Sequence, residues 1–289
     1  MAHIPTDRQI KVCCATFYQS DIVRLLLGDV FHPGGLALTQ YLGEVIGLGP
    51  ADHVLDVACG RGLSAVHLAE RFGCHVTGLD YGPDNVAAAE AHAAERGVTH
   101  LTTFRQGDAE GLPFDDGTFD AVISECSFCT FPDKPTAAAE MARVLRVGGR
   151  LGLTDMTVTG ALPDDIQSLL AWVACVAGAG TPEEYVATLR QAGFTDFVVE
   201  DHHDALRELV TDVHLRLLGL ELAIGLSKLE SRTASEAALA EALANADNKH
   251  PADNEHPVDL DEAKRLTRRG IELIERGVVG YTLIAARNK

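Results

Sequence analysis

The sequence is poor in basic residues, and it lacks both a long apolar run and a basic leader. Its 24 Lys and Arg stand against 42 Asp and Glu, a net charge of −18. Because this charge repels phosphate backbones and acidic membrane faces, we expect no nucleic-acid or membrane partner. The longest apolar stretch, 169–180, is too short to span a bilayer. The start, MAHIPTDRQIKVCC, lacks the pattern of a signal peptide, so we expect a cytoplasmic protein.

Disulfides are also not expected. The seven cysteines are an odd number, and in a reducing compartment thiols more often stay free, bind ligands or pack in the core. With 289 residues, 46% of them hydrophobic, the chain is long enough for one large domain or two small ones.

From residue 52 onward, short apolar runs alternate with helical patterns, which is typical of a parallel sheet with helices on both faces. The runs predict strands at 53–57, 75–79, 102–106, 119–124, 150–155, 197–200 and 280–286. The patterns between them predict helices at 63–72, 84–96, 137–145 and 181–192. The sequence therefore predicts an α/β fold.

The organisation along the chain predicts four segments. An N-terminal helical cap covers 1–50, and the central α/β unit covers 51–203. The next 75 residues, 204–278, are far longer than a normal loop and predict a helical insertion before the last strand. Residues 279–289 supply that closing strand. The insertion would be a lid over the site or the interface of a homodimer.

A cofactor site is indicated by VLDVACGRG, residues 54–62, which joins the first expected strand to the first helix. Gly60 and Gly62 remove side chains where backbone must approach a ligand closely, and Asp56 can accept hydrogen bonds from an ammonium group. Dinucleotide enzymes use a similar turn with a third glycine. Residues 60–65 read GRGLSA and lack that glycine.

Two further acids extend this site. Asp80 lies 24 residues after Asp56, at the end of the second expected strand, where an acid can bind both ribose hydroxyls. Asp108 ends the third expected strand and is placed to accept a hydrogen bond from the exocyclic amine of an adenine. The spacing predicts an adenosine-containing cofactor.

Four motifs in this order, VLDVACGRG, VTGLDYGPDNV, QGDAEGLPFDDGTFDAVIS and MARVLRVGGRLGLTD, resemble the class I S-adenosylmethionine-dependent methyltransferases. The resemblance implies a Rossmann-like seven-stranded sheet and S-adenosyl-L-methionine as cofactor. It implies cofactor contacts from Asp56, Ala58, Gly60, Gly62, Asp80, Tyr81, Asp108, Ala109, Ser124 and, closing over the methionine carboxylate, Tyr18. Ala58 departs from the glycine usual in that family, which predicts a lower cofactor affinity.

A C-x-x-C pair, Cys126 and Cys129, lies in SECSFCT at 124–130, after the fourth expected strand. Thiolates of this spacing can chelate a soft ion. The context is similar to the arsenite methyltransferase family, which has SNC and then PDK where this chain has SEC and FPDK. That family also has a cysteine in W-x-x-C-x-x-G-A ahead of GFTD, which matches Cys175.

This second resemblance implies a metalloid substrate, arsenite or methylarsenite. Cys126 and Cys175 would be the catalytic metalloid ligands, and Cys14, Cys13 or Cys129 would complete the set. Thiolate-bound arsenic keeps a lone pair that can attack the methyl carbon without a general base, so catalysis would rest on alignment.

Two other functions stay open. One is methylation of a carbon or oxygen atom of a small organic molecule, with cysteines that only pack, since free cysteine is among the most buried residue types. The other is a non-catalytic sensor of a metalloid or cofactor.

Overall fold

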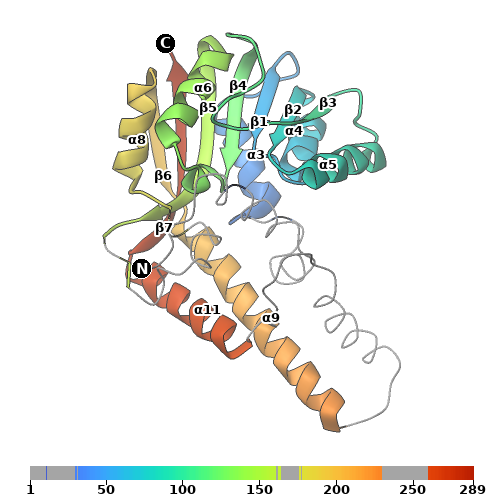
Figure 1. The fold of residues 1–289 in the computed structure, drawn as a ribbon, viewed down its shortest axis with the longest axis vertical. Coiled ribbons are helices and arrows are strands. Elements are labelled where there is room, and N and C mark those ends of the chain that lie inside the picture. Colours follow the sequence, from blue (N-terminus) through green and yellow to red (C-terminus); the bar gives the residue numbers. More distant parts are fainter. Residues whose placement is uncertain are drawn as a thin grey trace.

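The computed structural model describes residues 11, 30, 32–160, 162–163, 176, 178–229 and 260–289. At its centre is a seven-stranded sheet with the strand order β3-β2-β1-β4-β5-β7-β6 (Figure 1). Strands β1 to β5 pair in parallel, whereas β7 is antiparallel to β5 and β6. The strands are β1 (His53–Val57), β2 (His75–Asp80), β3 (Thr102–Gln106), β4 (Phe119–Glu125), β5 (Leu145–Val158), β6 (Phe194–Asp201) and β7 (Val279–Asn288). The predicted α/β sheet is confirmed.

The strand order reverses at β1. The chain passes from β1 to β2 and β3 on one side of β1, and then returns to place β4 on the other side. In open α/β sheets, ligands bind in the crevice that such a reversal opens at the carboxyl ends of the strands. The topology therefore predicts a ligand-binding crevice at the carboxyl ends of β1, β2 and β4.

Helices flank the sheet in two groups. Helices α3 (Gly35–Val45), α4 (Leu63–Phe72) and α5 (Pro83–Arg96) form one group, in which α4 packs against both of the others. Helices α4 and α5 also contact β2 and β3, whereas α3 contacts β5 and β7. Helices α6 (Lys134–Val144) and α8 (Pro182–Gln191) form the other group and pack against each other (Figure 1). The observed helices agree with the four predicted ranges to within three residues at each end.

Helix α8 shows how local sequence sets these boundaries. The Thr181 hydroxyl accepts from the Glu184 N–H at 3.1 Å, and the Glu184 carboxylate accepts from the Thr181 N–H at 2.8 Å. This reciprocal pair satisfies two backbone donors at the helix start, and Pro182 occupies a position where no N–H is needed.

Helix α3 packs against the sheet and contributes to the core. Leu42 is fully buried, and a Cβ added to Gly152 of β5 would lie 2.9 Å from the Leu42 Cδ1 atom. The close approach of α3 to β5 therefore depends on a glycine in the strand. The rest of the predicted 1–50 cap, apart from residues 11, 30 and 32–34, lies outside the described residues.

The predicted insertion contains two long helices, α9 (His203–Leu229) and α11 (Leu260–Glu275). They pack side by side and extend away from the sheet (Figure 1). The Lys264 ammonium pairs with the Glu221 carboxylate at 2.6 Å, and His214 Nδ1 lies 2.8 Å from the Thr267 hydroxyl. The role of these helices as a lid over the site or as a homodimer interface stays a prediction. None of the described helices is long and apolar enough to cross a membrane.

Candidate active site

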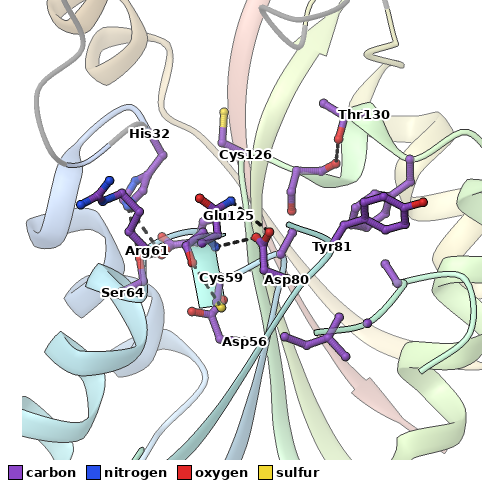
Figure 2. Close-up of a pocket in the computed structure, with 18 of the residues that line it drawn as sticks. His32, Asp56, Cys59, Arg61, Ser64, Asp80, Tyr81, Glu125, Cys126 and Thr130 are labelled. Atoms are coloured by element: carbon purple, nitrogen blue, oxygen red, sulfur yellow. Dashed lines mark hydrogen bonds and ion pairs between the residues drawn. The ribbon is translucent and has the colours of Figure 1, made fainter. Parts of the chain in front are cut away.

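A pocket opens at the carboxyl ends of β1, β2 and β4, as the reversal of strand order predicts (Figure 2). Seven of the predicted cofactor residues line it: Asp56, Ala58, Gly60, Asp80, Tyr81, Asp108 and Ala109. Gly62 and Ser124 are not among the lining residues, and Tyr18 lies outside the described residues. The structure thus brings together most of the side chains that the sequence motifs singled out.

The two glycines of the turn after β1 have different roles. Gly60 has a φ of 52°, lines the pocket, and a Cβ there would meet nothing within 4 Å. A Cβ at Gly62 would instead lie 2.7 Å from the Ala89 Cβ and 2.9 Å from the Phe104 ring. Gly60 therefore leaves open space for a ligand. Gly62 is needed for close packing, because its neighbours are side chains, and its predicted contact with the cofactor stays a prediction.

Asp80 ties the turn after β1 to the turn after β2. Its Oδ2 atom accepts from the Gly60 N–H at 2.8 Å, and its Oδ1 atom accepts from the Gly82 N–H at 2.8 Å and from Asn85 Nδ2 at 3.0 Å. Burial raises the pKa of this carboxyl, and the hydrogen bonds from Asn85, Gly82 and Gly60 oppose the rise. Because a carboxylate has about four lone-pair sites, Asp80 retains capacity for a ribose hydroxyl.

Asp56 has a buried oxygen without a partner. The residue is 2% exposed, and its Oδ2 atom finds no hydrogen-bond donor among the described residues. Burial, and then the nearby Glu125 and Asp80 carboxylates, raise its pKa well above the ordinary value. A buried acceptor without a donor is costly, so this atom fits a ligand that brings a cation, such as the ammonium of a methionine group.

At the adenine end, Asp108 forms an ion pair that the sequence reasoning missed. The Lys11 Nζ atom lies 2.8 Å from Asp108 Oδ2 and 2.5 Å from Glu110 Oε2. Burial lowers the pKa of Lys11, but the two carboxylates outweigh burial and raise it overall. Nothing in the local sequence pattern relates Lys11 to residues almost a hundred positions away.

Glu125 at the end of β4 is a second residue that sequence reasoning missed. Its side chain is 4% exposed and lines the pocket beside Cys126 (Figure 2). Its Oε2 atom accepts from the Ser64 hydroxyl at 2.7 Å and from the Thr39 hydroxyl at 3.0 Å, and lies 3.6 Å from His32 Nε2. The signal for it was the glutamate in SEC, where the arsenite methyltransferase family has asparagine.

The two thiols of the C-x-x-C pair have different environments. Cys126 lines the pocket, with a φ of 52° and an N–H that donates to the Thr154 carbonyl at 2.7 Å. Cys129 is fully buried in the hydrophobic core. The described residues contain no group of three His, Cys, Asp or Glu side chains that could hold a metal ion. The other predicted metalloid ligands, Cys14 and Cys175, lie outside the described residues.

Ser124 supports the turn after β4 from within the sheet. It is fully buried, and its hydroxyl donates to the Val57 carbonyl at 3.2 Å and lies 2.5 Å from the Ser127 hydroxyl. The described structure thus gives Ser124 a role in joining β4 to β1. Its predicted contact with the cofactor stays a prediction.

Sequence comparison identifies related proteins. A family model described as a methyltransferase domain matches residues 55–153. The chain is 36% identical over 155 residues to the sarcosine/dimethylglycine N-methyltransferase of Halorhodospira halochloris, covering 54% of this chain and 56% of that protein. It is 34% identical over 220 residues to the nocamycin O-methyltransferase of Saccharothrix syringae, covering 68% and 74%. It is 34% identical over 150 residues to the arsenite methyltransferase of Halobacterium salinarum, covering 51% and 38%.

A solved structure shares the fold. The phosphoethanolamine N-methyltransferase 2 of Haemonchus contortus, in complex with S-adenosyl-L-methionine, aligns with a TM-score of 0.72 at 20% identity. The alignment covers 98% of this chain and 57% of that chain. At this identity the likeness concerns the fold alone.

Proposed function

The chain belongs to the S-adenosylmethionine-dependent methyltransferases, and we propose that it transfers the methyl group to a hydroxyl group of a small organic molecule. S-adenosylmethionine supplies an electrophilic methyl group when it is bound. The pocket residues fit this cofactor: the unpartnered Asp56 oxygen suits its ammonium, Asp80 its ribose and Asp108 its adenine amine.

One observation carries the choice of acceptor, namely the buried pair of His32 and Glu125 on the pocket wall. A hydroxyl group has to lose its proton when its oxygen is methylated. The His32 imidazole can take this proton as a general base, and the Glu125 carboxylate, whose Oε2 lies 3.6 Å from His32 Nε2, would stabilise the imidazolium that forms. Such a positioned group contributes about 100-fold or more to many proton transfers. Thiolate-bound arsenic carries no proton and needs no such pair.

The relatives support the same choice. The nocamycin O-methyltransferase is matched over 74% of its length, whereas the arsenite methyltransferase is matched over 38% of its length. An oxygen acceptor is therefore favoured by the relative that shares more of its chain with this protein.

Thiol-bound arsenic is the second candidate, and Cys126 favours it. This thiol lines the pocket, directly after Glu125. Cys129, fully buried in the core, is badly placed to assist it. A three-thiolate site would therefore depend on Cys14 and Cys175, whose part in it stays a prediction. No feature of the described residues favours the non-catalytic sensor.

The test is an assay of S-adenosylhomocysteine release with two kinds of acceptor. Purified protein is incubated with S-adenosylmethionine and either a panel of phenols and alcohols or arsenite with a thiol reductant, and the products are identified by mass spectrometry. We expect methyl ethers from wild type, about 100-fold slower formation by His32→Gln, and little change for Cys126→Ser. Methylated arsenic that is lost in Cys126→Ser, with no methyl ether formed, would establish the second candidate instead.

A further inference from the structure

Thr39 is a buried hydroxyl residue to which the proposed function gives no role. It lies in α3, is fully buried, and is not among the residues that line the pocket. Its hydroxyl donates to both oxygens of the Glu125 carboxylate, at 3.2 Å to Oε1 and at 3.0 Å to Oε2. The same Oγ1 atom lies 3.3 Å from His32 Nε2. Thr39 therefore stands behind the pocket wall and contacts both members of the proposed proton-transfer pair.

Two further hydroxyls hold the Glu125 carboxylate in place. The Ser64 hydroxyl donates to its Oε2 atom at 2.7 Å, and the Thr154 hydroxyl donates to its Oε1 atom at 3.5 Å (Figure 2). The Tyr281 hydroxyl in turn donates to Thr154 Oγ1 at 3.0 Å, which leaves the Thr154 proton for Glu125. Among the residues that the structure describes, His32 is the one basic side chain within ion-pair distance of this carboxylate. Neutral donors from three elements thus fix Glu125 opposite a single base.

The hydrogen bonds of His32 decide which ring nitrogen can take a proton. Its Nδ1 atom lies 3.3 Å from the Pro33 carbonyl oxygen, which can only accept, so we assign the proton of the neutral ring to Nδ1 and leave Nε2 as the base. Once Nε2 has taken a proton, it needs an acceptor. Because a hydroxyl has a single proton, and that of Thr39 is directed at Glu125, the Thr39 oxygen offers a lone pair to Nε2. The contacts of Thr39 therefore suit the protonated imidazole that forms during the reaction.

We infer that Thr39 is a positioning residue for methyl transfer, which holds the Glu125 carboxylate toward His32 and accepts a hydrogen bond from Nε2 once that atom is protonated. In this step the O–H bond of the acceptor breaks and its proton binds Nε2, while the oxygen bonds to the methyl carbon and the carbon–sulfur bond of the cofactor breaks. The inference rests on the proposed function, because only an acceptor that loses a proton uses this cluster. Interactions that strengthen in the transition state raise the rate of the chemical step and leave substrate binding unchanged.

Steady-state and single-turnover assays of methyl ether formation test the inference, with a phenol or alcohol that wild type accepts. Thr39→Val removes the hydroxyl and nearly keeps the shape of the side chain. It should lower the single-turnover rate about tenfold or more, since hydrogen bonds to charged groups contribute that much, and change both Michaelis constants less than about twofold. Thr39→Ser keeps the hydroxyl and should retain most of the rate. A near wild-type rate for Thr39→Val, or an equal loss for Thr39→Ser, overturns the inference.

Two further variants separate positioning from a loss of structure. In a Glu125→Gln background, Thr39→Val should cost only a few fold, because most of its effect passes through Glu125, whereas a structural defect would multiply the two losses in full. The matched control is Thr102→Val, at a buried hydroxyl that donates to the Val98 carbonyl at 3.1 Å and is not among the pocket-lining residues. Its rate should equal that of wild type.

A failure of the proposed function would look different, because wild type would then form no methyl ether. In that case crystal structures of the S-adenosylhomocysteine complexes decide the inference without an acceptor. The Glu125 carboxylate should lie within about 4 Å of His32 Nε2 in wild type and should turn away in the double variant Thr39→Val with Ser64→Ala. A carboxylate that stays in place in the double variant overturns the inference.

Discussion

The turns that follow β1 and β4 lie on the same pocket and begin in the same way. Ala58 and Cys126 both have a positive φ, 61° and 52° respectively. Residues other than glycine rarely adopt this backbone conformation. Each turn redirects the chain at the carboxyl end of a central strand. Their hydrogen bonding is nevertheless different.

The turn after β4 is satisfied by the protein itself. The Asp155 carboxylate accepts from the N–H groups of Ser127 at 3.1 Å, Cys129 at 3.0 Å and Met156 at 2.7 Å. The end of β1 and the turn after it instead have polar groups without partners among the described residues, namely the Asp56 Oδ2 atom in the strand and the side chain of Arg61 in the turn, which also lines the pocket. One turn is therefore built to hold a ligand, and the other to form a rigid wall.

The largest effect is expected from removing the carboxylate that accepts hydrogen bonds from the turn after β4. Asp155→Ala leaves three backbone N–H groups without their acceptor. We expect the free energy of unfolding to fall by about 4 kcal/mol, measured by urea denaturation, since each unsatisfied buried donor costs about 1–3 kcal/mol. Asp155→Asn, which keeps one acceptor oxygen, should lose less. A loss below about 1 kcal/mol would show that the turn does not depend on Asp155.

Removing the Asp56 charge should have opposite effects on binding and stability. Asp56→Asn should bind S-adenosylhomocysteine about 100-fold more weakly, because the ammonium loses its counter-ion in a buried site. The free protein should become more stable by about 1 kcal/mol, because an uncompensated buried charge is gone. Calorimetry and urea denaturation measure the two effects, with Asp115→Asn, at an exposed position, as the control. Unchanged binding would contradict the assignment of Asp56.

The stability gain of Asp56→Asn should depend on pH in a defined direction. Burial, with Glu125 and Asp80, raises the pKa of Asp56 in the folded protein. A raised folded pKa means that the protonated form stabilises the fold, and that this contribution is lost as pH rises through the raised value. The difference between Asp56→Asn and wild type should therefore be largest near neutral pH and shrink as the pH falls toward about 4. A difference that grows on acidification would contradict the raised pKa.

The two thiols of the turn after β4 should differ in their effect on stability. Cys129 is fully buried in the core, so Cys129→Ala leaves a small cavity and should cost about 1 kcal/mol. Cys126 is partly exposed to the pocket, and Cys126→Ala should cost less than half as much. Thermal or urea denaturation of the two variants side by side measures the difference. Equal costs would show that Cys126 also packs as a core residue.

The smallest effects are expected from placing glycine at the positive-φ position of each turn, Ala58 and Cys126. Ala58→Gly and Cys126→Gly each relieve a left-handed strain of about 1–2 kcal/mol, offset in part by the greater entropy of glycine in the unfolded chain. We expect each to stabilise the protein by about 0.5 kcal/mol. Only Ala58→Gly should also strengthen S-adenosylhomocysteine binding, by a few fold, since that turn faces the cofactor. An equal gain in affinity for both variants would remove the distinction between the turns.

Much of the β1 half of the pocket could be predicted because its signals are local. The strand, the glycine turn and the acids at the ends of β2 and β3 follow each other in sequence, and Asp56, Gly60, Asp80 and Asp108 all line the pocket. The sequence also predicted the strands of the sheet, although β5 and β6 are longer than expected.

The missed features depend on contacts between distant segments. Glu125 is held by Thr39 of α3, Ser64 of α4 and Thr154 of β5, which no local pattern brings together. The close packing of Ala89 and Phe104 around Gly62 is also known only from the fold. The absence of a described partner for Arg61 likewise becomes visible only once the surrounding side chains are placed.

A crystal structure of the protein with S-adenosylhomocysteine bound tests the central claim most directly, because it shows which turn holds the ligand. We predict the ligand ammonium at Asp56 Oδ2, its methionine part along the turn after β1, and a turn after β4 whose hydrogen bonds to Asp155 are unchanged. A ligand whose methionine part is held instead by the turn after β4, with Asp56 Oδ2 still unpartnered, would contradict the account.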